Sequence, residues 1–465
     1  MQISLSKLKP AITSAQMTQD VQVTGLTTDS RRISKGDLFV ALRGEHHDAH
    51  HFLDAVAQSG AAAVVAEQVP AGFSLPALIV PDTQMALQEI ARHWRQQFHI
   101  PVIGVTGSNG KTTVKEMIAS ILVAHAGAEN CLSTSGNLNN EIGVPLTVLR
   151  LNPKHQCAVI ELGMNHPGEI ALLASIARPT VGLVNNAQRE HQEFMQSVDA
   201  VAIENGSVLR SLPVDGTAVF PANDTYSTLW RDLANELGQR KVLTFGLSTD
   251  NADNSEVADV QATYQPNGFG CDMQISVEGQ SFPVRLSAAG THNVLNALAA
   301  AACCHAIGIS NDTIALGLQS FQPVNGRLQR KLAWNGATII DDTYNANPDS
   351  VRAAIDVLAQ AGKDGILVLG DMGEVGEEGA AFHLEIGAYA RERGISRLLT
   401  LGDLAKDAMQ AFGVDASHFN DIAALCSALD AIVSPTSTVL IKGSRFMKME
   451  RVIAHLTKQQ SIGNH

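Results

Sequence analysis

The stretch that decides the fold is Gly104-Val-Thr-Gly-Ser-Asn-Gly-Lys-Thr-Thr113, which stands between an apolar run and a helical pattern that continues to Ala126. A strand, a glycine-rich loop and a helix in this order are typical of a phosphate-binding loop, because glycines let the backbone point its N–H groups at phosphate oxygens. Lys111 would add a charge for the β- and γ-phosphates, and the Thr112 hydroxyl can bind Mg²⁺. The strict GxxxxGK[ST] pattern is not met, since valine stands at its first position. The context still predicts an ATP- or GTP-binding domain, although such a loop does not identify a reaction.

Strand and helix signals alternate after this loop, in CAVIELG, PGEIALLASIA, TVGLVNN and TAVFP. This alternation predicts βαβ units and a parallel sheet buried on both faces. Residues 257–287 instead alternate polar and apolar side chains around Asn267-Gly268, which favours a small antiparallel insert. A second α/β series begins near Pro323, and its strands ATIIDD, GILVLGD, RLLTLGD and TVLIKGS place Gly or Asp at the sheet edge where open α/β folds bind ligands.

The chain is therefore expected to be an α/β protein of three domains. Its 465 residues leave room for two to four domains. We expect a small mixed α/β domain at 1–84, a central phosphate-loop domain with a parallel sheet at 85–315, and a Rossmann-like α/β domain at 316–465.

Composition excludes several classes of function. The apolar fraction is 45% and the charged fraction 17%, which is ordinary globular usage. The net charge of −13 gives no global field for nucleic acid or anionic lipid. No apolar run approaches the ~20 residues of a membrane span, and the start lacks the features of a signal peptide. Six cysteines without a CxxC pair exclude a zinc ribbon. We expect a reduced, soluble, cytoplasmic protein.

Further motifs give the phosphate loop a family context. TGSNGKTT resembles the ATP loop of the Mur ligases and their folylpolyglutamate synthase relatives, and the resemblance extends over essentially the whole chain. The motifs that carry it, in family order, are SGNLNNEIGVP (135–145), ELGMNHPGEI (161–170), GTHNVLNALAA (290–300), NGRLQ (325–329) and DDTYNANPDS (341–350). Within the family, DDTYNANPDS, GDMGEVG and KGSRFMKME resemble the members that add a dipeptide.

The resemblance implies an ATP-dependent ligase of peptidoglycan precursor synthesis. Such an enzyme would join D-alanyl-D-alanine to the carboxylate of a UDP-N-acetylmuramoyl-tripeptide. Because a carboxylate is a poor acyl electrophile, the γ-phosphoryl group would first be transferred to it, and the amine would then displace phosphate. The implied cofactors are ATP and Mg²⁺, the partners are these small molecules with neither nucleic acid nor membrane, and we expect a monomer in the cytoplasm.

The resemblance also implies the site residues. Lys111, Glu161 and His191 would be catalytic, and Thr112, Glu161 and His191 would bind Mg²⁺. The ATP site would comprise Gly107, Ser108, Asn109, Gly110, Lys111, Thr112, Thr113, Asn293, Asn296, Arg327 and Asp342. The substrates would contact Ser30, Arg31, Arg43, Asn137, Asn140, Tyr344, Asn345 and Asn347. We interpret the histidines of GEHHDAHHF as part of the substrate-loop pattern and not as a metal site.

One departure from the family pattern concerns the second metal. Relatives carry a lysine in a pattern resembling AKGE, whose carbamate helps to hold that ion, whereas this chain has Asn205 in the slot and Ser207 in place of the acid. Asparagine cannot be carbamylated. Either other oxygens hold the ion, with Glu204 nearby, or the site is weaker.

Three alternatives remain open. A ligase of the same family that adds one amino acid is the nearest, although the DNPR-like motif for a diamino acid is absent and NANPDS stands instead. A folylpolyglutamate-type synthase would lack the domain that residues 1–84 are expected to form. A nucleotide-gated binding module would need the loop but gives no reason for Glu161, His191 and a third domain together.

Overall fold

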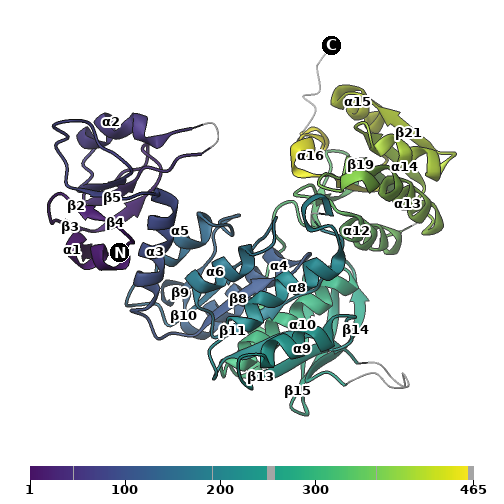
Figure 1. Cartoon of the computed structure of the whole chain (residues 1–465). Coiled ribbons are helices and arrows are strands. Elements are labelled where there is room, and N and C mark those ends of the chain that lie inside the picture. The colour runs from purple at the N-terminus through teal and green to yellow at the C-terminus, as the bar shows by residue number, and fades with distance from the viewer. Residues whose placement is uncertain (45–46, 191, 249–256, 363, 459–465) are drawn as a thin grey trace.

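The computed structural model describes residues 1–44, 47–190, 192–248, 257–362 and 364–458. His191, proposed from the sequence as catalytic and metal-binding, therefore lies outside the described residues, as does His46 of the histidine run. Three sheet-based units follow one another along the chain (Figure 1). The expectation of a three-domain α/β architecture is confirmed.

The N-terminal unit is built on a five-stranded sheet. The strand order is β2 (Gln16–Met17), β7 (Ala77–Ile79), β6 (Ala63–Ala66), β5 (Asp37–Val40) and β4 (Gly25–Thr27), with β2 antiparallel and the others parallel. A small pair, β1 (Ile3–Ser4) and β3 (Gln22–Val23), and the helices α1 (Leu5–Leu8) and α2 (Leu53–Gln58) complete it. Every residue of β5 and β6 is buried, as expected for strands covered on both faces.

Helix α3 (Thr83–Arg95) joins this unit to the next. The Asp82 side chain accepts a hydrogen bond from the Met85 N–H and so caps the first turn. The core-facing side of α3 belongs to one apolar cluster that includes residues of both units, among them Leu38, Ile90 and Ala158. The boundaries expected at 84 and 315 fall inside α3 and α11 (Asn311–Ser320), so the limits of the domains stay a prediction.

The central unit holds the decisive stretch at the end of an inner strand of a nine-stranded sheet. The order is β16 (Gln280–Leu286), β15 (Gly270–Val277), β14 (Val260–Asn267), β13 (Lys241–Leu247), β12 (Thr217–Pro221), β11 (Val181–Val184), β8 (Val102–Thr106), β10 (Cys157–Glu161) and β9 (Cys131–Ser133). The segment from β14 to β16 is antiparallel, which confirms the pattern seen around Asn267-Gly268. It extends the main sheet and forms no sheet of its own, because β14 pairs in parallel with β13.

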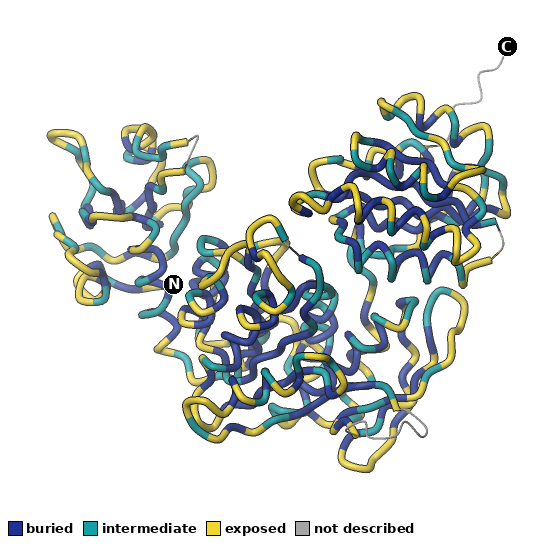
Figure 2. The backbone as a smooth tube through the Cα atoms, turned by 45° about the vertical axis from the view of Figure 1, so that its right-hand side comes forward, coloured by how far each residue is buried: buried dark blue, intermediate teal, exposed yellow. Residues whose placement is uncertain are grey.

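Two helical layers bury the two faces of this sheet. Along β8, Val102 joins one apolar cluster while Ile103 and Val105 join the other, as the alternation of a strand requires. The first cluster contains residues of α6 (Glu169–Ala177) and α8 (Val198–Arg210), and α9 (Ser227–Asn235) packs beside α8. The second contains α4 (Lys111–Ala126), α10 (Thr291–Ala306) and α11. Figure 2 shows mostly buried backbone in the interior of this unit and exposed backbone mostly at its surface. The short α5 (Gly143–Val148) and α7 (Gln192–Met195) lie in connections.

The C-terminal unit is a second, six-stranded sheet. Its order is β17 (Gln329–Leu332), β18 (Thr338–Asp342), β22 (Thr438–Lys442), β19 (Gly365–Gly370), β20 (Arg397–Leu401) and β21 (Ala416–Phe419), and β17 alone among these pairs antiparallel. The helices are α12 (Pro348–Gln360), α13 (Gly379–Glu392), α14 (Ala405–Phe412), α15 (Ile422–Ile432) and α16 (Glu450–Thr457). The strands expected at ATIIDD, GILVLGD, RLLTLGD and TVLIKGS are present, while β17 and β21 were not foreseen. No helix in the described ranges is both long and apolar enough to cross a membrane.

Close helix packing fixes the position of α4, which begins at the phosphate loop. A Cβ atom at Gly317 of α11 would lie 2.4 Å from the Ile121 Cα of α4. The Ser120 hydroxyl donates a hydrogen bond of 2.7 Å to the Gly317 carbonyl at the same contact. Glycine is needed here because the two backbones touch.

We predict that Gly317→Ala lowers the free energy of unfolding of the central unit by ~1–3 kcal/mol, since backbone atoms cannot move aside as a side chain could. The measurement is the midpoint of thermal unfolding, compared with Leu316→Ala on the exposed side of α11, where the side chain is 57% exposed. Equal midpoints for the two variants would contradict the packing argument.

Candidate functional site

The phosphate loop has the backbone geometry that its glycines permit. Gly107 and Gly110 have φ angles of +133° and +82°, in the region that side chains other than glycine rarely adopt. A Cβ atom at Gly110 would lie 2.5 Å from the Asn296 Oδ1 atom. The Lys111 ammonium group donates to the Gly107 carbonyl at 2.6 Å and to the Glu190 Oε1 atom at 2.6 Å. The Gly107 carbonyl and the Glu190 carboxylate therefore hold Lys111 at the loop, and a bound phosphate would compete with them for the protons of its ammonium group.

Glu161 ends β10 at the carboxyl edge of the sheet and is only 2% exposed. Its Oε1 atom accepts hydrogen bonds from the Thr112 hydroxyl at 3.2 Å and the Asn139 amide at 2.9 Å. Its Oε2 atom is buried without a hydrogen-bond partner among the described residues. A buried carboxylate oxygen without a partner, next to a threonine hydroxyl, is the donor set that a hard cation such as Mg²⁺ prefers.

A chain of buried amides lines the wall beside α10. The Asn296 Nδ2 atom donates to the Asn293 Oδ1 atom, and Asn185 Nδ2 donates to both Asn296 Oδ1 and the Asn109 carbonyl. The Asn185 Oδ1 atom has no partner among the described residues. The adjacent His292 was missed by sequence reasoning, although it stands inside the quoted motif THNVLN. Burial lowers the pKa of His292 to about 4, so its ring is neutral near pH 7.

The opposite wall comes from the C-terminal unit. The Lys442 ammonium group pairs with the Asp342 carboxylate at 2.6 Å, and both side chains are nearly buried. The backbone N–H of Leu328 also donates to Asp342. The Arg327 guanidinium group stacks over the Tyr344 ring at 4.1 Å from its centre, which is a favourable cation–π distance.

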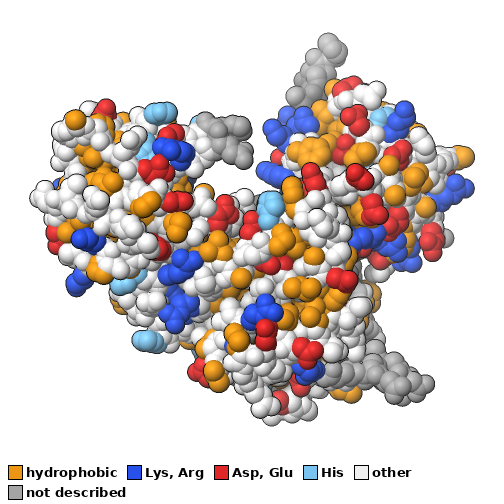
Figure 3. Space-filling model, in the orientation of Figure 1, with side chains coloured by type: hydrophobic (Ala, Val, Ile, Leu, Met, Phe, Trp, Pro, Cys, Tyr) orange, Lys and Arg blue, Asp and Glu red, His pale blue; other side chains and the backbone are white. Residues whose placement is uncertain are grey.

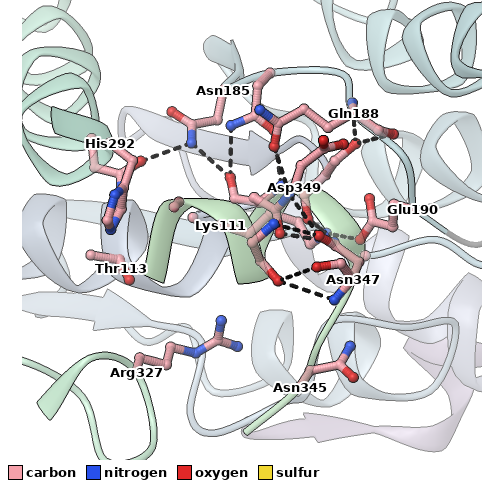
Figure 4. Close-up of a pocket in the computed structure, with 18 of the residues that line it drawn as sticks. Lys111, Thr113, Asn185, Gln188, Glu190, His292, Arg327, Asn345, Asn347 and Asp349 are labelled. Carbon is pink, nitrogen blue, oxygen red and sulfur yellow. Dashed lines mark hydrogen bonds and ion pairs between the residues drawn. The ribbon is translucent and has the colours of Figure 1, made fainter. Parts of the chain in front are cut away.

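These walls enclose one cavity of about 830 Å³ between the central and C-terminal units. Among the residues expected from the sequence, its lining includes Ser108, Asn109, Gly110, Lys111, Thr113, Asn140, Glu161, Asn293, Asn296, Arg327, Asp342, Tyr344, Asn345 and Asn347. Gly107 and Thr112 are not among the lining residues, and they donate hydrogen bonds to Asn205 and Glu161, respectively. Figure 4 shows the side chains of both walls pointing toward one another.

The remaining expected residues lie elsewhere. Asn137 belongs to the loop after β9 and does not line this cavity. Ser30, Arg31 and Arg43 belong to the N-terminal unit, across the open cleft that Figure 3 shows above the central unit. The Arg31 side chain is 87% exposed and pairs with Asp29, and its hydrogen bonds lower the pKa of the Asp29 carboxyl to about 2.

The histidine run around Asp48 has a structural role where it is described. The His50 ring accepts a hydrogen bond from the Glu67 N–H at its Nε2 atom, so its Nδ1 atom carries the proton and donates to Asp48. Arg43 bridges Asp48 and Glu67 from outside. This supports the interpretation of the run as a loop pattern and not a metal site.

Arg189 connects the central and C-terminal units, and sequence reasoning did not foresee it. Its guanidinium group forms ion pairs with Asp349 of α12 at 2.6 Å and Glu385 of α13 at 2.7 Å. These two carboxylates raise the pKa of Arg189 above its usual value. The amide groups of Asn109 and Asn347 are also hydrogen-bonded across the same interface at 2.9 Å. Both sides of the cavity are thus tied together by polar contacts.

The position expected to carry a lysine is occupied by a fully buried amide. The Asn205 Oδ1 atom accepts from the Thr106 hydroxyl at 2.6 Å and from the Gly107 N–H at 3.1 Å. Asn205 therefore supports the start of the phosphate loop. The neighbouring Glu204 accepts a hydrogen bond from the Ile170 N–H at the start of α6 and does not line the cavity.

Three segments of the chain match models of one protein family. Residues 22–95 match the family described as Mur ligase, catalytic domain, residues 105–304 match the Mur ligase middle domain, and residues 326–445 match the Mur ligase glutamate ligase domain. The chain belongs to the Mur ligase family. The matched segments follow the order of the three sheets, which confirms the resemblance seen in the sequence.

Individual relatives of this Mur ligase are similar over nearly their whole length. It is 39% identical over 456 residues to the UDP-N-acetylmuramoyl-tripeptide–D-alanyl-D-alanine ligase of Escherichia coli K12, covering 98% of each chain. It is 34% identical to the Bacillus subtilis protein of the same name, covering 97% of this chain and 96% of that one. The crystal structure of MurF from Acinetobacter baumannii matches with a TM-score of 0.91 at 34% identity, covering 98% of this chain and 99% of that one. That of the MurF ligase from Thermotoga maritima in complex with ADP matches with a TM-score of 0.83 at 26% identity, covering 94% and 98%.

We predict that Arg189→Ala shifts this Mur ligase toward an arrangement in which the central and C-terminal units are further apart. Hydrogen bonds to charged groups contribute ~1.5–3 kcal/mol each, so the ratio of closed to open molecules should fall at least about tenfold. The measurement is the radius of gyration by small-angle X-ray scattering.

The matched control is Arg393→Gln, which removes an ion pair with Asp356 inside the C-terminal unit. If Arg189→Ala has the same radius of gyration and the same midpoint of thermal unfolding as the parent, other contacts hold the two units together.

Proposed function

We propose that this Mur ligase joins D-alanyl-D-alanine to the terminal carboxylate of a UDP-N-acetylmuramoyl-tripeptide, with ATP converted to ADP and phosphate. The observation that carries the proposal is the cavity between the two sheets, where a phosphate loop with its lysine faces Asp342 and Arg327. The names of relatives that are similar over nearly the whole chain supply the substrates. The place of this reaction is cytoplasmic peptidoglycan precursor synthesis, and we propose that the enzyme acts as a monomer.

The chemistry follows from the charges at the loop. Transfer of the γ-phosphoryl group to a carboxylate needs positioning and neutralisation of charge more than a protein nucleophile. Lys111, at the start of α4, is placed to supply that charge, and the helix N-terminus adds its dipole. Displacement by the amine of the dipeptide then gives the amide. Enclosure between two units would keep water from the acyl phosphate.

Nucleotide would lie between the amide wall and the C-terminal unit. Asn293 and Asn296 present donors and acceptors of the kind that read the edge of a base, and the ring of His292 is neutral beside them. Asp342 is suited to accept hydrogen bonds from ribose hydroxyls, because its carboxylate lines the cavity and is held in place by the ion pair with Lys442. Arg327 would contact the phosphates from the opposite side.

Mg²⁺ fits the residues present at the end of β10. Thr112 and Glu161 would hold it, since the Glu161 Oε2 atom is buried and lacks a partner among the described residues. The ion would neutralise phosphate charge when bound. His191, which lies outside the described residues, remains proposed as a further ligand from the sequence.

The UDP part of the substrate would bind the N-terminal unit. Ser30 and Arg31 lie in the exposed turn after β4, and Arg43 follows β5. A hydroxyl and two guanidinium groups suit a diphosphate. The tripeptide would then reach the cavity past Asn137 and Asn140, and Tyr344, Asn345 and Asn347 would contact the reacting ends.

The experiment that tests the proposal is phosphate release in the presence of ATP with each substrate alone and with both. Turnover should require UDP-N-acetylmuramoyl-tripeptide and D-alanyl-D-alanine together. Turnover with a single amino acid in place of the dipeptide would favour another Mur ligase activity, and turnover with a folate would favour a folylpolyglutamate-type synthase. Nucleotide binding without turnover would favour a binding module.

We predict that Lys111→Ala lowers kcat by at least ~10²–10³-fold, because it removes the lysine charge at the transferred phosphoryl group. The circular dichroism spectrum of the variant should match that of the parent. Among the described residues, the Lys111 side chain donates hydrogen bonds only to loop carbonyls and to Glu190. Lys331→Ala, which removes a lysine paired with Asp341 away from the cavity, is the control. Normal turnover in folded Lys111→Ala would refute the ATP-loop assignment.

Arg31→Ala should raise the KM for the UDP substrate about tenfold or more and leave the KM for ATP nearly unchanged. The reason is that Arg31 is exposed in the N-terminal unit, whereas the proposed ATP site lies between the other two. Separate saturation curves for each substrate measure the difference. An equal rise in both KM values would remove the N-terminal unit as the UDP site.

A further inference from the structure

Two buried carboxylates flank the start of α4. Glu161 is hydrogen-bonded to Thr112, and Glu190 is paired with the preceding residue, Lys111. The two acids are 2% and 8% exposed, and both line the cavity. Burying a carboxylate is costly unless positive charge or hydrogen bonds compensate it.

The environment of the Glu161 carboxylate indicates a site for a ligand. Its Oε2 atom is buried without a hydrogen-bond partner in the described part of the chain, although the Oε1 atom of the same group has two. A buried carboxylate oxygen without a partner is costly, and a cation in the adjacent part of the cavity would compensate it.

The charge of the Glu190 carboxylate is compensated by Lys111, as long as the lysine side chain is directed toward it. In the structure the Lys111 ammonium group uses its three protons on the Gly107 carbonyl, the Ser108 carbonyl and the Glu190 carboxylate. A phosphate group in the loop must replace at least one of these acceptors. Glu190 comes from a separate segment after β11, whereas both carbonyls belong to the loop itself, so the contact with Glu190 is the one that phosphate would displace. Figure 4 shows Glu190 and Lys111 on the same side of the cavity.

Displacement would leave Glu190 buried beside the added negative charge of the phosphates. At short range in a poorly solvated site this repulsion is substantial. A divalent cation between the carboxylate and the phosphates would remove it, because Mg²⁺ binds carboxylate and phosphate oxygens together.

Three other polar groups among the described residues do not meet this need. Asn205 offers a neutral amide, and its oxygen is already used by Thr106 and Gly107. Glu204 caps α6 through Ile170 and lies outside the cavity lining. Asp349 does line the cavity, but its carboxylate is held by Arg189.

We propose that Glu190 is the carboxylate that binds a second divalent cation when nucleotide occupies the loop, in place of a carbamylated lysine. This inference rests on the proposed ATP- and Mg²⁺-dependent function. It makes Glu190 a residue with two partners, Lys111 before nucleotide binding and the metal afterwards. It also makes the second metal site independent of dissolved carbon dioxide, because Asn205 has no amine that could react with it.

The experiment titrates the full chain with Mn²⁺ in the presence of a non-hydrolysable ATP analogue and follows bound ion by electron paramagnetic resonance. The parent should bind two Mn²⁺ ions, with no change in either affinity on addition of bicarbonate. Glu190→Gln, which keeps the size of the side chain, should weaken the second ion at least tenfold and leave the first nearly unchanged. Glu190→Asp should show a smaller loss than Glu190→Gln.

Glu204→Gln is the matched control, since its amide oxygen can still accept from Ile170, and both Mn²⁺ affinities should equal those of the parent. Thermal unfolding of every variant shows whether the chain is folded, and Glu190→Asp keeps the charge if Glu190→Gln fails to fold.

Unchanged binding of the second ion by folded Glu190→Gln would overturn the proposal and leave Glu190 as a counter-ion of Lys111. A strengthening of the second site by bicarbonate would overturn it as well, by showing that a lysine carbamate supplies the charge. Binding of only one Mn²⁺ ion by the parent would also overturn the proposal. The proposed ligase function is tested separately, because it stands if the parent releases phosphate only with both substrates present.

Discussion

The Arg189 guanidinium group, held between Asp349 and Glu385, is the interaction on which the arrangement of the cavity depends. Parallel sheets covered by helices on both faces leave only their carboxyl edges for ligands. The central sheet offers the phosphate loop and Glu161 at its edge, and the C-terminal sheet offers Asp342. Neither edge encloses a nucleotide by itself. The ion pairs of Arg189 bring the two edges to face one another, and the Asn109–Asn347 contact repeats the link at the loop.

The polar groups of the cavity hold one another in place. Asn185 donates a hydrogen bond to Asn296, which in turn donates to Asn293, so that these side chains are held in one orientation. The atoms left without partners in the described structure include Asn185 Oδ1 and Glu161 Oε2, and both belong to residues that line the cavity. An unsatisfied buried oxygen lowers stability, and here it stands where a ligand could compensate it. The free energy of unfolding is therefore lowered by these two oxygens, and a bound ligand that contacts them would raise it again.

The N-terminal unit is constructed differently from the cavity. Arg31 and Arg43 are half or more exposed and pair with acids of their own unit, Asp29, Asp48 and Glu67. Exposed pairs of this kind contribute little to stability and exchange partners at low cost. The open cleft between this unit and the C-terminal unit leaves such side chains accessible to a large substrate (Figure 3).

The sequence by itself determined the elements and the groups that end them. Glycine spacing, apolar periodicity and the position of Lys111 after a strong strand are local signals, so the phosphate loop, the parallel strands and the antiparallel segment could be predicted from them. The roles expected for Glu161 and Asp342 came from the resemblance to the Mur ligases, and each of these residues also ends a strand.

Only the tertiary structure decided which polar side chains meet. Arg189, Glu190 and Asp349 are charged residues in loops or at a helix start, and nothing in their local sequence distinguishes them from solvent-exposed charges. Their roles arise from contacts between segments about 80 to 200 residues apart, which no local pattern encodes. Glu204 shows the reverse case, because proximity in sequence to Asn205 suggested a metal ligand, whereas the turn of α8 directs its carboxylate to the start of α6. Side-chain direction on a helix changes by about 100° per residue, so neighbours in sequence need not share a site.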